Sequence, residues 1–148
     1  HNTRIAIFVF GLGVFCCAPA MVLTFTNGML LGAFMALHVE RGLGWDLGGW
    51  LSIHGVTELS AICVACAGGV TLGLALLFPG DRTRADSLRL AGRDAAKLAI
   101  VAGVMLLVAA LLEGFARQLV QDMQMRYILG WSIGALWLLW ALLAGRRP

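Results

Sequence analysis

The stretch that decides the fold is Trp50–Phe78, WLSIHGVTELSAICVACAGGVTLGLALLF. It contains one acidic residue, Glu58, and no lysine or arginine. The hydrocarbon core of a bilayer is roughly 30 Å thick and takes about 20 apolar residues of helix, so this stretch is long enough to cross it with some tilt. Pro79 and Gly80 follow directly and are typical helix breakers. The stretch therefore predicts a transmembrane helix.

Further apolar segments on both sides of this stretch predict an all-α, polytopic transmembrane helix bundle. We expect about five membrane segments in a single domain, residues 1–148, at 5–26, 28–40, 50–78, 95–115 and 127–144. The break between the first two is predicted at Asn27-Gly28, because this dipeptide is typical of turns. The segment 28–40 is short, so it is either a tilted crossing, which we favour, or a half-spanning helix.

The composition of the whole chain agrees with a membrane domain. Of its 148 residues, 60% are hydrophobic and 13% are charged, and the mean hydropathy is +0.88. A soluble globule needs more polar surface than this. The net charge of +3 is spread over loops without a basic stripe, which argues against nucleic-acid binding. The chain begins at His1 without a leader, so we expect it to be the C-terminal part of a longer protein.

The distribution of lysine and arginine predicts the orientation, because cytoplasmic loops retain positive charge. With five crossings, one face collects Arg82, Arg84, Arg89, Arg93, Lys97, Arg146 and Arg147, and the other face collects Arg4, Arg41, Arg117 and Arg126. We therefore expect the arginine loop 81–94 and the C-terminus in the cytoplasm, and residue 1 outside.

Three ionisable residues lie inside the predicted helices: His54, Glu58 and Glu113. Such a residue costs roughly 2.5 to 3.5 kcal/mol on insertion, so it marks either a function or an internal pair. His54 and Glu58 are four residues apart and share a helix face. That face also holds Ala61, Ala65, Gly68 and Gly69, and the face of Glu113 holds Ala99, Ala102, Ala109 and Ala110. Small residues line helix contacts in lipid, so both carboxylates are expected to point inward.

We expect this polar cluster to converge near the external side, with Arg4 and Asn2 as partners that neutralise a carboxylate. Three interpretations remain open. The cluster could be a structural network of ion pairs and hydrogen bonds, a proton or cation path, or a metal site in which His54, Glu58 and Glu113 bind zinc or another divalent metal.

Cysteine and glycine have structural interpretations. The cysteines lie in apolar segments, where the thiol usually acts as a small hydrophobe. Gly69 and Gly73 form a pair spaced for close contact with another helix of the bundle.

Five motifs, in order along nearly the whole chain, resemble a known family. They are Asn2–Ala6, Asn27–Ala33, His54–Leu59, Gly73–Gly80 and Ala109–Phe115. The most specific combination is His54-Gly-x-x-Glu58-Leu59 together with Glu113-Gly114-Phe115. On these motifs the chain resembles the stage II sporulation protein M family.

The resemblance implies a multi-pass protein of the bacterial cytoplasmic (inner) membrane, often preceded by a cytoplasmic segment and another membrane helix. In spore formers, the namesake helps to assemble a peptidoglycan-degrading machine and acts as its membrane anchor rather than as the hydrolase. Many relatives occur in bacteria and archaea that do not sporulate. The resemblance assigns no catalytic residue.

We therefore expect a membrane scaffold or anchor of a cell-envelope complex. Its expected partners are the lipid bilayer, other envelope membrane proteins and a second copy of the chain. Two alternatives stay open: a proton- or cation-coupled transporter or channel that uses His54, Glu58 and Glu113, and a metal-dependent intramembrane hydrolase. The sequence shows no nucleophile and base pair, cofactor fingerprint or soluble catalytic domain, so we lean against an enzyme.

Overall fold

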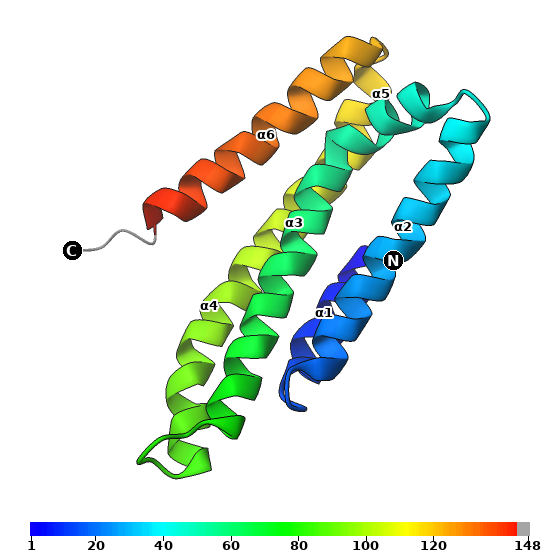
Figure 1. The fold of residues 1–148 in the computed structure, drawn as a ribbon. Helices are drawn as coiled ribbons and strands as arrows, with labels where there is room; N and C mark the ends of the chain where they lie inside the picture. The colour runs from blue at the N-terminus through cyan, green and yellow to red at the C-terminus, as the bar shows by residue number, and fades with distance from the viewer. Residues whose placement is uncertain (145–148) are drawn as a thin grey trace. The chain divides into compact units, whose positions relative to one another are not determined.

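The computed structural model describes residues 1–144, and every regular element in them is helical. The elements are α1 (Asn2–Gly13), α2 (Ala18–Glu40), α3 (Gly44–Leu77), α4 (Arg84–Leu111), the π-helix η1 (Leu112–Ala116), α5 (Arg117–Leu119) and α6 (Met123–Ala144) (Figure 1). The predicted fold class, an all-α bundle of apolar helices, is confirmed.

Within residues 1–144, four helices are long and apolar enough to cross a membrane: α2, α3, α6 and the helix Arg84–Leu119, in which α4, η1 and α5 continue one another. The helix α1 has 12 residues, which correspond to about 18 Å. That is less than the roughly 30 Å of a hydrocarbon core. The helix that is too short to span is therefore α1. The segment 28–40, predicted as a tilted crossing or a half-spanning helix, is the second half of the longer helix α2.

The predicted helix break at Asn27-Gly28 is wrong, because α2 continues through both residues. Inside a bilayer each unsatisfied backbone group costs several kcal/mol, whereas a glycine in a helix costs only about 1 kcal/mol. The chain breaks instead at 14–17, where Cys16 and Cys17 have positive φ angles of 57° and 64°. Pro19 explains this position: it has no N–H to donate and its ring clashes with the preceding turn, so α1 cannot continue through it.

The polar connections are shorter than the sequence predicted. The gap between the predicted segments 28–40 and 50–78 is reduced to 41–43, where Gly42 has a φ of 74° and the Leu43 N–H donates to the carbonyl of His38, 2.8 Å away. The expected loop 81–94 is mostly helix, because Thr83 begins α4 by accepting a hydrogen bond from the Asp86 N–H, 3.2 Å away. The gap between the predicted segments 95–115 and 127–144 is reduced to 120–122.

The chain forms two compact units, and the three long helices α2, α3 and α4 each contribute to both. The first unit comprises His1–Gly32 and Ala61–Met105, and the second comprises Ala33–Ser60 and the chain from Leu106 onward. The second half of α3 therefore belongs to the first unit and its first half to the second unit.

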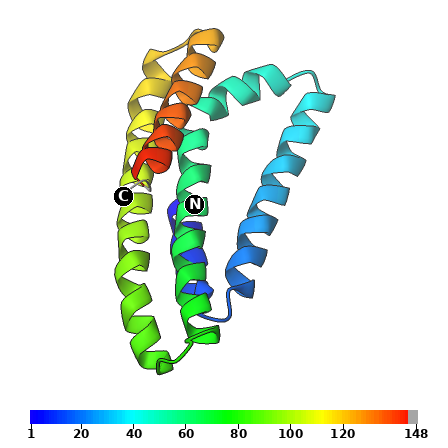
Figure 2. The same cartoon turned by 60° about the vertical axis from the view of Figure 1, so that its left-hand side comes forward.

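In the first unit, α3 packs directly against α1 through glycine. A Cβ atom at Gly69 would lie only 2.7 Å from the carbonyl oxygen of Phe10, and one at Gly73 only 2.9 Å from the backbone nitrogen of Cys17. Both positions advance together along the two helices, so α1 and α3 run parallel. The predicted close contact at Gly69 and Gly73 is confirmed. On another side of α3, Gly68 lies against Ala95 of α4, and α3 and α4 form the antiparallel hairpin seen in Figures 1 and 2.

In the second unit, α3 makes a second contact of the same kind with α6. A Cβ atom at Gly130 would overlap the backbone of Ser52, and one at Gly134 would lie 2.5 Å from Cγ1 of Val56. These pairs also advance together, so the start of α6 runs parallel to the start of α3. Gly130 and Gly134 have the spacing that brings membrane helices into close contact.

These two contacts predict how the chain responds to an added methyl group. Gly69→Ala and Gly130→Ala should each lower the free energy of unfolding in detergent by about 1 to 3 kcal/mol, because the new Cβ overlaps backbone that has to move. The matched control is Gly103→Ala in α4, where nothing lies within 4 Å of a Cβ. It should be neutral or slightly stabilising, since alanine favours a helix. Equal effects of all three substitutions in denaturant titrations would contradict the glycine contacts.

Candidate functional site

His54 is one of the most deeply buried polar residues of the second unit. Its side chain is 3% exposed, and its ring meets that of Trp50, one turn earlier in α3, edge to face at a centroid distance of 5.2 Å. Its Nδ1 atom and the Oγ1 atom of Thr57, which is 1% exposed, have no hydrogen-bond partner in the described residues. Buried polar atoms in proteins are nearly always bonded, so these two atoms are exceptions one turn apart on one helix.

Glu113 lies in the π-helix η1, which covers the motif Leu112–Ala116. A carboxylate oxygen of Glu113 is 3.5 Å from Nη1 of Arg117, four residues later, and the two side chains are 44% and 35% exposed. Short π-helices are rare and often occur at functional sites. The ion pair between Glu113 and Arg117 is therefore partly exposed. That the Glu113 carboxylate points inward stays a prediction.

Arg117 connects this ion pair to the buried histidine through Trp50. Its guanidinium carbon lies 5.7 Å from the centre of the Trp50 ring, which is within the range of a cation–π interaction. The contacts run from Glu113 to Arg117, to Trp50 and to His54, all within the second unit. From the sequence, Arg117 entered only the count of positive charges at the two membrane faces. Its position four residues after Glu113 also indicates an ion pair on a helix.

The other residues of the predicted cluster are placed as follows. Glu58 is half-buried on α3, one turn after His54. Arg4 is exposed on α1, and Asn2 is the first residue of that helix; both belong to the first unit. Their pairing with a carboxylate stays a prediction. The small residues expected on the faces of Glu58 and Glu113 are partly buried: Ala61, Ala65, Ala102 and Ala109 are at most 3% exposed, whereas Ala110 is exposed.

The structure gives no support to the predicted metal site. Within residues 1–144, no three side chains of His, Cys, Asp or Glu come together in a way that could hold a metal ion. The cysteines in this part of the chain form no disulfide, and Cys17 is buried beside the carbonyl oxygen of Val70, 3.5 Å away. The polar residues can therefore carry charge pairing and hydrogen bonding, and we derive no metal chemistry from them.

The contact between Arg117 and Trp50 predicts a measurable coupling. In a double-mutant cycle of Arg117→Met and Trp50→Leu, the unfolding free energies in detergent should deviate from additivity by about 0.5 to 1 kcal/mol. The matched control is Trp45→Leu, because Trp45 stacks on Tyr127 at 4.4 Å instead. Its cycle with Arg117→Met should be additive. A cycle with Trp50 that is equally additive would show that the cation–π contact contributes nothing.

Comparison with known proteins gives one finding about the family. A family model described as stage II sporulation protein M matches residues 1–116. The match covers α1 to α4 and ends with the last residue of η1, while α6 lies outside it. The curated proteins and the solved structures give no match. The matched part is well over half of the chain and contains the motifs around His54 and Glu113. The chain thus belongs to the stage II sporulation protein M family.

Proposed function

We propose that the chain is a membrane scaffold that anchors a cell-envelope complex by packing α2 against a helix of a partner membrane protein. The observation that carries this proposal is a pair of glycines on α2, Gly28 and Gly32. Within residues 1–144, nothing lies within 4 Å of a Cβ placed at either position. The similar pairs that begin at Gly69 and Gly130 are already packed against α1 and α3. The pair on α2 is therefore a helix-packing surface that no part of residues 1–144 occupies.

A longer stripe of small residues supports the same surface. Every fourth residue of α2 is small: Ala20, Thr24, Gly28, Gly32 and Ala36. Ala20 is fully buried, whereas the last three are exposed. The Thr24 hydroxyl donates to the Ala20 carbonyl at 2.9 Å, so it needs no other acceptor. One end of the stripe is therefore buried, whereas the end formed by Gly28, Gly32 and Ala36 is open to contact with another helix.

Exposure of apolar side chains would not by itself require a protein partner, because lipid tails are as apolar as leucine. Only 6% of the apolar window of α2 is buried, compared with 33% for α3, and lipid could cover the difference. Glycines change this balance because they let two backbones approach closely and gain van der Waals contact along the helices. Packing of a partner helix against Gly28 and Gly32 therefore gives more van der Waals contact than lipid tails give there.

Copurification from membranes tests the scaffold proposal. Leucine at both positions, Gly28→Leu with Gly32→Leu, should reduce the recovery of partner proteins about tenfold, equivalent to about 1.4 kcal/mol. The thermal stability of the chain itself should not change, because both sites are open. The control is Gly103→Leu, an equally open glycine of α4. If the double variant retains its partners as well as the control does, the proposed surface is wrong.

We also propose that the α3–α4 turn faces the cytoplasm of a bacterial inner membrane. The support is the concentration of positive charge at Arg82 and over the first turns of α4. Since α1 runs parallel to α3, this orientation directs residue 1 toward the external face.

Labelling of single introduced cysteines by a membrane-impermeant maleimide tests this orientation. Gln121→Cys, in the α5–α6 connection, should react in intact spheroplasts. Arg82→Cys should react only after lysis, and the unsubstituted chain provides the background from the native cysteines. Labelling of Arg82→Cys before lysis would reverse the orientation.

The two alternative functions have weaker support. A transporter or channel would draw on the unpaired buried atoms of His54 and Thr57. The ring contact of His54 with Trp50, and the ion pair of Arg117 with Glu113 beside Trp50, are also explained by a structural network. A metal-dependent hydrolase has no metal-ligand group in residues 1–144 to support it.

A further inference from the structure

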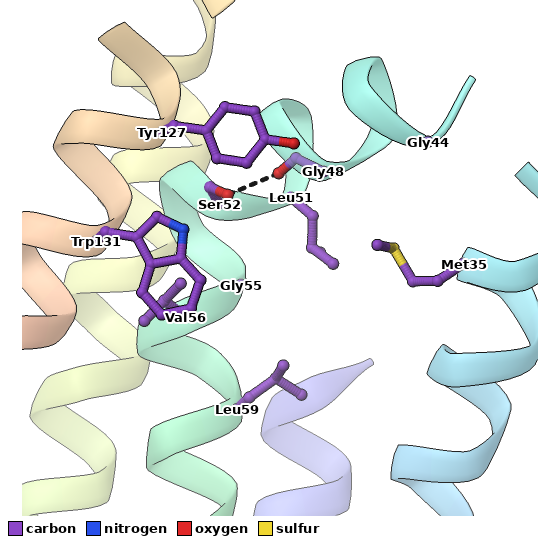
Figure 3. A pocket seen from close by; sticks show the side chains of 10 residues that line it. All are labelled: Met35, Gly44, Gly48, Leu51, Ser52, Gly55, Val56, Leu59, Tyr127 and Trp131. Atoms are coloured by element: carbon purple, nitrogen blue, oxygen red, sulfur yellow. Dashed lines mark hydrogen bonds between the residues drawn. The ribbon is translucent and has the colours of Figure 1, made fainter. Parts of the chain in front are cut away.

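A cavity of about 290 Å³ lies inside the second unit, among α2, α3 and α6. Figure 3 shows Met35 of α2 on one side, Tyr127 and Trp131 of α6 on the other, and α3 residues between them. Gly44, Gly48 and Gly55 line the cavity with backbone only. The remaining lining residues are Leu51, Ser52, Val56 and Leu59.

The lining offers water almost nothing to bind. The polar side-chain groups of the lining are the indole N–H of Trp131 and the hydroxyls of Ser52 and Tyr127, and both hydroxyls already donate their proton. The Ser52 hydroxyl donates to the carbonyl of Gly48 at 2.7 Å, and the Tyr127 hydroxyl donates to the carbonyl of Trp45 at 3.0 Å. A buried water needs two to four polar partners, so this cavity favours an apolar occupant although it has room for many waters.

The aromatic residues place one end of the cavity at the level of the lipid headgroups. Trp45 and Tyr127 stack at that end with ring centroids 4.4 Å apart, and tryptophan and tyrosine concentrate at membrane interfaces. The first turns of α3 run crosswise, and the helix then turns along the cavity (Figure 3), where the wall from Leu51 to Leu59 is about 12 Å long. The hydrocarbon of one leaflet is roughly 15 Å deep, half of the bilayer core. The cavity therefore extends from the headgroups through about one leaflet.

Its size argues against a protein helix as the occupant. A stable protein interface takes about 20 to 30 residues from each partner, whereas ten residues line this cavity. A transmembrane partner helix would also need a groove across both leaflets. A single hydrocarbon chain needs only the depth and the apolar walls that are present.

We propose that this cavity binds one acyl chain of a bilayer phospholipid, with the headgroup at the end formed by Trp45 and Tyr127. The site is distinct from the glycine surface of α2, and it depends on membrane insertion but not on the scaffold role. Failure of the copurification experiment would therefore leave the lipid site unaffected.

Trp131 lines the cavity and can report on its occupant. In the full chain purified in detergent and stripped of lipid, Trp45, Trp50, Trp137 and Trp140 are replaced by phenylalanine so that only Trp131 fluoresces. Phenylalanine at position 45 keeps an aromatic ring to stack on Tyr127. Addition of phosphatidylglycerol with dibrominated acyl chains should quench Trp131 in a saturable way, near one lipid per chain. An excess of the unbrominated lipid should restore the fluorescence.

Filling the cavity should weaken this binding. Leu51→Phe with Leu59→Phe should raise the lipid concentration at half-maximal quenching about tenfold. The matched control is Leu74→Phe with Leu77→Phe, on the same helix outside the cavity, and it should leave the value unchanged. Thermal melts establish that each variant is folded, and Leu59→Phe alone serves if the double variant is not. Equal half-saturation in filled and control variants, or quenching that never saturates, would overturn the lipid site.

Discussion

The absence of water in the bilayer core is the constraint on which this structure depends. Peptide groups there have no solvent to bond with, so each long apolar segment stays helical through residues that would end a helix in water. Asn27 and Gly28 are the clearest case. The same constraint removes the usual hydrophobic driving force between helices, and close backbone contact has to replace it.

Helix α3 supplies both of the closest contacts that result. Its second half receives α1 at Gly69 and Gly73, and its first half receives α6 at Ser52 and Val56. In each case the neighbour runs parallel to α3, and glycine on one of the two helices makes the approach possible. The first half of α3 also carries the buried polar residues His54 and Thr57, which are 3% and 1% exposed.

Much of this could be predicted from the sequence, and the errors have physical causes. Hydropathy and length identified the helical class, and the spacing of Gly69 and Gly73 identified a contact surface. The turn signal at Asn27-Gly28 failed because turn propensities describe chains in water, whereas the constraint imposed by Pro19 is steric and holds in any solvent. The contact of Arg117 with Trp50 joins residues 67 positions apart. No local pattern encodes such a contact, and only the intrahelical pairing with Glu113 was accessible.

The parallel pairing of α3 with α6 has a consequence for the order in which the chain assembles. Ser52 meets Gly130, which is synthesised about 80 residues later. At about 5 to 20 residues per second, the first half of α3 remains without this neighbour for roughly 4 to 16 seconds after it leaves the ribosome. The contacts of α1 with α3 involve earlier residues and are completed first. During biogenesis, the α3 face at Ser52 and Val56 thus stays in the membrane without the helix that packs on it, and this interval is when an insertion chaperone would be most needed.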